Sequence, residues 1–211
     1  MKQADWYFDF VSPFAYLQLA MMDEVAKRAA VTMKPVLLAG ILNHFGQKGP
    51  AEIPGKRQFT YRHVQWLAES RGISIRFPPA HPFNPLKALR LAVALRGDPA
   101  AIRTIFSHLW REGRSLEPGG DWEALCAQVP ISNADAAVKE QWVKDGLADN
   151  GRRALAAGVF GVPTFVIDGR AFWGADSTQM VVDYLKDPQR FQSAEFARLD
   201  ALPIGAERRT P

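Results

Sequence analysis

The chain has 211 residues, of which 47% are hydrophobic, and a net charge of +4. This length is enough to bury a full core in one large domain, or in one domain with an insertion. The basic residues are scattered and form no RNA-binding motif, so we expect no nucleic-acid partner. The sequence contains no apolar run of 18 residues, so we expect no membrane-spanning helix. Residues 1–5 contain no apolar stretch of the kind that a secretory signal needs. A single cysteine, Cys126, fits a reducing compartment, and we expect a cytoplasmic protein.

The first 40 residues read as a β-α-β unit. A β-type run covers 4–11 and ends at Ser12-Pro13, apolar residues recur at helical spacing over 13–30, and 31–38 is again strand-like. This order predicts two parallel strands joined by a crossover helix.

The middle of the chain is predicted to be helical. Glycine and proline punctuate 40–56, which predicts a loop, and a helix follows over 57–71. Residues 73–77 are a candidate extended piece before several prolines. Further helices are predicted over 85–96, 98–113, 121–129 and 133–157.

The chain then returns to β structure. Strands over 164–167 and 171–173 flank Asp168-Gly169, a hairpin signal, and a helix is predicted over 177–185. The two β-containing ends must pack together to bury their faces. We therefore predict an α/β fold with a large inserted all-helical domain. Its parts are 1–40 with 158–186 (the β-containing domain), 41–157 (helical insertion with a preceding loop) and 187–211 (a partly helical or loose tail).

Ser12-Pro13 is the most informative dipeptide. Serine is a favoured helix N-cap and proline a favoured first helical residue, so a hydroxyl is placed where a strand gives way to a helix. Free N–H groups and the helix dipole favour an anion at such a position. A redox cysteine would be expected here in a disulfide-exchanging protein, but residues 12–15 contain none. The pattern therefore favours a protein that binds a thiolate and does not supply one.

Three motifs carry a family resemblance: Asp9-Phe10-Val11-Ser12-Pro13-Phe14, the stretch Gly158 to Phe165 (GVFGVPTF), and Phe172-Trp173-Gly174-Ala175-Asp176. In order and spacing they resemble the 2-hydroxychromene-2-carboxylate isomerases. That family groups with kappa-class glutathione transferases in the DsbA-like branch of the thioredoxin superfamily. The likeness covers about residues 4–186 and implies a thioredoxin-like fold with a large inserted all-helical domain.

The resemblance implies glutathione as cofactor, an anionic aromatic acid as substrate, and a homodimer. The implied reaction is a cis–trans isomerisation between 2-hydroxychromene-2-carboxylate and trans-o-hydroxybenzylidenepyruvate-like catabolites. Ser12 matches the serine that contacts the glutathione sulfur. Further glutathione contacts are expected from Gln47, Lys48, Lys56, Val162, the cis-proline Pro163, Ala175, Asp176 and Ser177. Substrate contacts are expected from Phe14, Phe45, Phe83 and Asn84.

Other interpretations remain open. Kappa-class proteins usually carry arginine after the aspartate, where this chain has Ser177. A kappa-type glutathione transferase or peroxidase shares the thiolate site, and a non-catalytic thioredoxin-like binding protein would use the cis-proline groove for peptides. A disulfide oxidoreductase needs two nearby cysteines, which the chain lacks. The four histidines show no metal-type spacing, so no metal is predicted and each is interpreted as a surface or core residue. Asp9 is left outside the predicted site.

Overall fold

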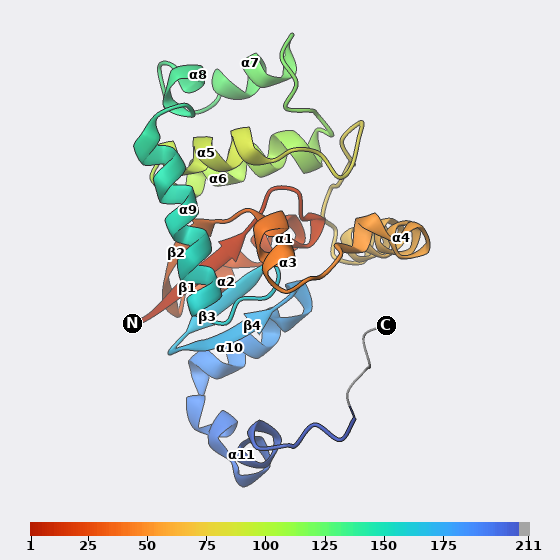
Figure 1. The fold of residues 1–211 in the computed structure, drawn as a ribbon, viewed down its shortest axis with the longest axis vertical. Coiled ribbons are helices and arrows are strands. Elements are labelled where there is room, and N and C mark those ends of the chain that lie inside the picture. The colour runs from red at the N-terminus through yellow and green to blue at the C-terminus, as the bar shows by residue number, and fades with distance from the viewer. Residues whose placement is uncertain (207–211) are drawn as a thin grey trace.

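The computed structural model describes residues 1–206 and contains a mixed sheet of strand order β2–β1–β3–β4 (Figure 1). β1 (Lys2–Phe8) pairs in parallel with β2 (Ala29–Pro35). β1 also pairs antiparallel with β3 (Thr164–Ile167), which forms a hairpin with β4 (Arg170–Trp173). The predicted β-α-β unit and hairpin are therefore confirmed, and the two ends of the chain share one sheet.

Aromatic side chains join the sheet to the helices above it. Trp6 and Phe8 of β1 are fully buried and stack with their ring centroids 4.6 Å apart. Phe10, beyond the strand, lies 4.7 Å from the ring of Phe106 in a later helix. Such aromatic contacts bury large apolar areas, so the first strand forms the centre of the core.

The crossover between β1 and β2 is two short helices and not one. α1 (Pro13–Leu19) ends at Ala20, and α2 (Met22–Ala26) begins after Met21, whose φ of −101° and ψ of 2° lie outside helical geometry. The prediction of a continuous helix over 13–30 was wrong at this break. The helical spacing of apolar residues continues across Met21, but the helical backbone conformation does not.

The helices between β2 and β3 agree with the predicted insertion, with three corrections. The expected loop over 40–56 begins as a helix, α3. The expected helix over 133–157 is divided at residues 138–140. Residues 73–77 form no strand, although the Arg76 N–H donates to the Trp110 carbonyl over 2.6 Å. The helices are α3 (Leu38–His44), α4 (Pro54–Ser70), α5 (Leu86–Ala94), α6 (Pro99–Phe106), α7 (Asp121–Cys126), α8 (Ala134–Ala137) and α9 (Gln141–Ala156).

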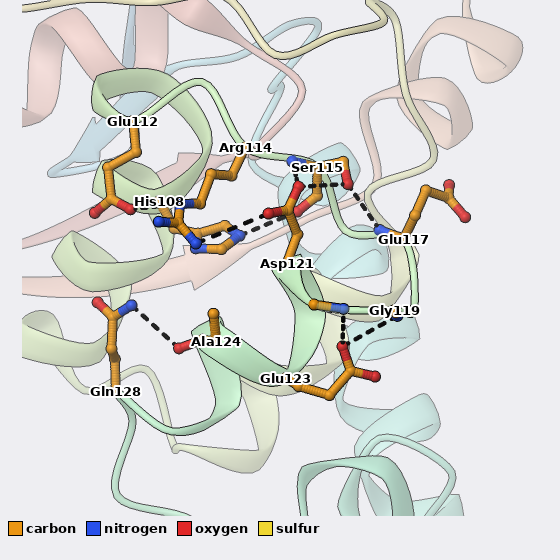
Figure 2. Close-up of polar contacts among 11 residues, drawn as sticks. His108, Glu112, Arg114, Ser115, Glu117, Gly119, Asp121, Glu123, Ala124 and Gln128 are labelled. Atoms are coloured by element: carbon orange, nitrogen blue, oxygen red, sulfur yellow. Dashed lines mark hydrogen bonds and ion pairs between the residues drawn. The ribbon is translucent and has the colours of Figure 1, made fainter.

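α6 runs directly into a π-helical turn, Ser107–Arg111, and the loop after it is held by acidic side chains (Figure 2). The Asp121 carboxylate accepts bonds from the N–H and the hydroxyl of Ser115, both 2.9 Å long. Glu123 accepts a bond from the Gly120 N–H at 2.8 Å and so caps α7. Buried His108 lies 3.0 Å from the Ser115 carbonyl through its Nε2. The loop at the far end of the insertion is therefore tied to both flanking helices.

The C-terminal part closes the sheet and then extends along the long axis of the molecule (Figure 1). α10 (Thr178–Lys186) follows β4, and α11 (Ala194–Asp200) lies at the opposite end from α7 and α8. Asp168 in the hairpin turn forms an ion pair with Lys2 and accepts a bond from the Tyr184 hydroxyl at 2.8 Å. The predicted tail is helical over part of its length; its last residues, 207–211, lie outside the described part. Over residues 1–206, no helix combines the length and apolar character needed to cross a bilayer.

Candidate functional site

Ser12 and the Val162-Pro163 bond lie at the same end of the sheet. Ser12 follows the carboxyl end of β1, and Pro163 immediately precedes β3. The two strands are antiparallel, with Tyr7 opposite Thr164, so the end of one lies beside the start of the other. The Val162-Pro163 peptide is cis, as predicted. The topology therefore brings together two segments that are about 150 residues apart in the sequence.

Ser12 is the N-cap of α1, and Pro13 is its first residue. The Ser12 hydroxyl oxygen accepts a bond from the Ala15 N–H at 3.3 Å, and the side chain is only 5% exposed. Within residues 1–206 the hydroxyl donates no hydrogen bond. Its hydrogen is therefore available for an acceptor brought by a ligand.

The turn that presents Ser12 is held by the buried carboxylate of Asp9. Its two oxygens accept bonds from the N–H groups of Val11 (3.0 Å) and Leu38 (2.8 Å), so the end of β1 is joined to the start of α3. Burial raises the pKa of Asp9 to about 7, although the amides of Leu38 and Val11 act in the opposite direction. Asp9 therefore changes its charge near neutral pH while fully enclosed.

The turn after β4 lies against the same region. The Gly174 N–H donates to the Pro163 carbonyl at 2.8 Å. The Gly174 carbonyl accepts bonds from buried Gln18 of α1 at 2.9 Å and from the Ser177 hydroxyl at 2.8 Å. Gly174 has a φ of +93°, and a Cβ there would lie 2.3 Å from a carboxylate oxygen of Asp176. Only glycine fits this position, and it leaves the Asp176 carboxylate exposed beside the turn.

The other predicted contacts are spread more widely. Gln47 and Lys48 are exposed after α3, and Lys56 is exposed in the first turn of α4. Phe14 lies 6.1 Å from the ring of His63. The remaining three residues serve other local contacts or face solvent: Phe45 is 43% exposed, Phe83 lies 6.3 Å from the Trp110 ring, and Asn84 accepts a bond from the Leu86 N–H at 3.0 Å.

A groove of about 760 Å³ lies beside α4. It is bounded by that helix and the proline-rich segment 77–81, and none of the residues predicted from the sequence lines it. His81 belongs to its wall and also reaches the Ser12 turn, since its Nε2 lies 2.8 Å from the Val11 carbonyl. Hydrogen bonds and strand register, and not the size of a groove, bring Ser12, Pro163 and Gly174 together.

Neither a metal centre nor a dithiol is present in the described part of the chain. Residues 1–206 contain no group of three or more histidine, cysteine or acidic side chains that could hold a metal ion. Cys126 is half-buried in α7, within the helical insertion. Burial raises the pKa of its thiol. The chain's one thiol therefore lies in the helical insertion, away from the Ser12 turn, and its raised pKa disfavours the thiolate.

Sequence reasoning missed the residues that hold the site in place. Asp9, Gln18, His81 and Trp110 all bond to the turns around Ser12 or Gly174. Asp9 carried a signal, because a carboxylate between two phenylalanines in a buried strand end must be paired. His81 and Trp110 carried none, since their partners are backbone carbonyls some 70 and 100 residues away.

The chain is similar in sequence to proteins of known family. The model of the DsbA-like thioredoxin domain matches residues 3–186. A 2-hydroxychromene-2-carboxylate isomerase from Sphingobium xenophagum is 26% identical over 195 residues, covering 88% of this chain and 99% of the relative. Glutathione S-transferase kappa 1 from Rattus norvegicus is 21% identical over 83% of this chain and 87% of its own length.

A solved structure shows the same fold. The selenomethionine form of a 2-hydroxychromene-2-carboxylate isomerase superposes with a TM-score of 0.71 at 21% identity, covering 94% of this chain and 98% of the other. The family model spans both ends of the sheet and the helices between them. The chain therefore belongs to the DsbA-like thioredoxin domain family.

Proposed function

We propose that the protein is a glutathione-dependent isomerase of an anionic aromatic acid, of the 2-hydroxychromene-2-carboxylate type. One observation carries the proposal: a helix N-terminus offers a free hydroxyl hydrogen at Ser12, while the chain provides no thiol there. A thiolate brought by a small molecule is the species that this arrangement stabilises.

The residues present fit a bound tripeptide in three further ways. Val162, next to the cis-proline, makes no backbone hydrogen bond within residues 1–206, so its N–H and carbonyl are free to pair with an extended ligand. The exposed Asp176 carboxylate, beside Ala175 and Ser177, suits the amino group of a γ-glutamyl unit. Gln47, Lys48 and Lys56 are polar or cationic residues suited to carboxylates.

Bound glutathione would supply a thiolate that adds reversibly to a conjugated double bond, so that the bond can rotate. This chain's part is to lower the pKa of that thiol. Ser12 donates a hydrogen bond to the sulfur, and the N-terminus of α1 adds its dipole. Lys48 and Asn84 are candidates to stabilise charge that develops on the substrate, and Phe14, Phe45 and Phe83 are candidates for its apolar wall.

The test is an isomerisation assay of the purified protein with 2-hydroxychromene-2-carboxylate, followed by ultraviolet absorbance with and without glutathione. We expect turnover only when glutathione is present. Equal rates in both conditions would contradict the proposal. A titration calorimetry experiment with glutathione alone gives an independent result, since a complete lack of binding would favour a non-catalytic binding protein.

A kappa-type transferase or peroxidase is the second candidate, favoured by the likeness to the rat kappa enzyme. It would use the same thiolate but release a conjugate. Turnover of chlorodinitrobenzene with consumption of glutathione, and no isomerisation of the aromatic acid, would select it. The departure at Ser177, where kappa proteins carry arginine, favours the isomerase.

A further inference from the structure

Two consecutive peptide units before Ser12 are each hydrogen-bonded at both ends. The unit that joins Phe10 to Val11 has its carbonyl bonded by Trp110 Nε1 (2.8 Å) and its N–H by the Asp9 carboxylate (3.0 Å). The unit that joins Val11 to Ser12 has its carbonyl bonded by His81 Nε2 (2.8 Å) and its N–H by the Asp9 carbonyl (3.0 Å). A planar unit held in this way cannot rotate without losing a bond, so the backbone that enters Ser12 is fixed.

Both side-chain donors come from the helical insertion. His81 lies in the connection between α4 and α5, and Trp110 lies in the π-helical turn after α6. Their ring centroids are 5.4 Å apart, and Phe77 packs edge-on against Trp110 at 5.2 Å. The insertion therefore contacts the Ser12 turn through two rings that are packed against each other.

The hydrogen positions at His81 follow from its partners. A carbonyl only accepts, so the His81 Nε2 facing Val11 carries a hydrogen. The Tyr61 oxygen lies 2.7 Å from both His81 Nδ1 and the His81 carbonyl, and its hydroxyl has one hydrogen to give. With neutral His81 that hydrogen goes to Nδ1. With protonated His81, Nδ1–H donates to the Tyr61 oxygen, and the hydroxyl hydrogen goes to the carbonyl.

The bond from His81 to Val11 is therefore present in both protonation states. Burial lowers the pKa of His81, and its bond to Val11 opposes that effect. The charged groups that share the groove with His81 are Arg57, Arg62 and Glu69 of α4. Their charges affect whether Nδ1 is protonated, whereas Nε2 carries its hydrogen in either state. A bond that persists in both protonation states suits a residue that positions the backbone better than one that transfers a proton.

We infer that His81 is a positioning residue for Ser12: its Nε2–H holds the peptide unit that precedes Ser12 and so sets the direction of the Ser12 hydroxyl. Without that donor, the Val11 carbonyl is left unpaired in a partly enclosed turn and rotates to find water. The consequence for catalysis rests on the proposed function, but the consequence for the turn does not.

A pair of variants separates the donor from the ring. In His81→Gln the amide nitrogen reaches the position of Nε2 and can donate to Val11. In His81→Asn the amide reaches only the position of Nδ1, so it can meet Tyr61 but not Val11. Two readouts are taken: hydrogen exchange of the Ser12 amide by NMR without glutathione, and the pKa of protein-bound glutathione from thiolate absorbance.

We expect His81→Asn to exchange the Ser12 amide about tenfold faster than wild type, and His81→Gln to restore protection to within about threefold. The pKa of the bound thiol should rise in the Asn variant and return toward the wild-type value in the Gln variant. A thermal unfolding curve for each variant shows whether both are folded, since a general loss of structure would not distinguish the two amides.

Equal Ser12 exchange in the folded Asn and Gln variants would overturn the inference. If both fail to fold, Tyr61→Phe replaces them, because it removes only the partner of Nδ1 and of the His81 carbonyl. We then expect faster Ser12 exchange by a smaller factor, and unchanged exchange would overturn the inference. Wild-type protein that does not bind glutathione would refute the proposed function while leaving the exchange result valid.

Discussion

At the scale of single residues, Ser12 combines two roles that two measurements on one variant separate. Its oxygen caps α1 through a long bond to the Ala15 N–H, and its hydrogen is free. The first role concerns stability and the second concerns the ligand. Because the capping bond is 3.3 Å long, we expect its loss to matter less than the loss of the free donor.

Ser12→Ala should therefore keep the fold and lose most activity. The loss of an N-cap costs about 1 kcal/mol, whereas the loss of a hydrogen bond to a charged sulfur should slow turnover by about tenfold to a hundredfold. Urea unfolding and the glutathione-dependent assay measure the two effects. An unchanged rate and an unchanged pH profile would show that Ser12 serves only as a cap. Ser193→Ala, which removes the corresponding cap of α11, is a matched control for stability alone.

Asp9 predicts a pH dependence of stability with a definite sign. Its pKa is raised to about 7 in the folded protein from an ordinary 3.8, so between these values the folded state holds a proton that the unfolded state lacks. Stability contributed by Asp9 is therefore greatest below the ordinary pKa and is lost as the pH rises to about 7. The full difference corresponds to roughly 4 kcal/mol.

Asp9→Asn removes this dependence. We expect the wild-type free energy of unfolding to fall between about pH 5 and about pH 7.5 by roughly 2–3 kcal/mol more than that of the variant. The variant should also be less stable at low pH, because its single carbonyl oxygen can accept from only one of the Val11 and Leu38 amides. Parallel curves for the two proteins would show that Asp9 does not titrate in this range.

At the scale of elements, the turn between β4 and α10 depends on one glycine. Gly174 and Gly169 both have positive φ values, +93° and +75°. A Cβ at Gly174 would collide with Asp176, whereas a Cβ at Gly169, in the hairpin turn, would meet open space. The two positions share backbone strain and differ in the collision.

Gly174→Ala should therefore do more harm than Gly169→Ala. Each should lose about 1–3 kcal/mol of stability from the positive φ, and Gly174→Ala the larger amount, because its ψ of 155° places it in a region that only glycine adopts readily. Only the first should also displace Asp176 and weaken glutathione binding. Urea unfolding measures the shared term, and calorimetric titration with glutathione measures the separate one. Equal glutathione affinity in the two variants would remove Asp176 and its turn from the proposed binding site.

The helices between β2 and β3 show where sequence patterns fail at this scale. Most of α3 lies in a stretch interpreted as loop because glycines and prolines are frequent there. Among the seven residues of α3, however, Gly40 is the only glycine and there is no proline. Its first N–H groups include that of Leu38, which finds its acceptor in Asp9. A tertiary bond therefore supports a helix start that local propensity does not predict.

At the scale of the whole molecule, the sheet and its hairpin could be predicted because their signals are local. Runs of aromatic and β-branched residues mark the strands, and Asp168-Gly169 marks the turn. The cis-proline and Gly174 could be placed beside Ser12 only through the family resemblance, since no local rule says which strands pair. The groove beside α4, and the support that His81 and Trp110 give to Ser12, depend on side chains meeting distant carbonyls. The expected homodimer stays a prediction, which light scattering on the purified protein would decide.

The single thiol at Cys126 gives the protein a built-in reporter. It is half-buried in α7, near the end of the insertion that Asp121 and Glu123 tie together, and its raised pKa slows attack on disulfide reagents. A chromogenic disulfide reagent should therefore label folded protein more slowly than unfolded protein, so the labelling rate reports on the packing around α7. No engineered cysteine is needed, so changes in the packing of the helical insertion can be followed in the unaltered chain while ligands are added at the Ser12 turn.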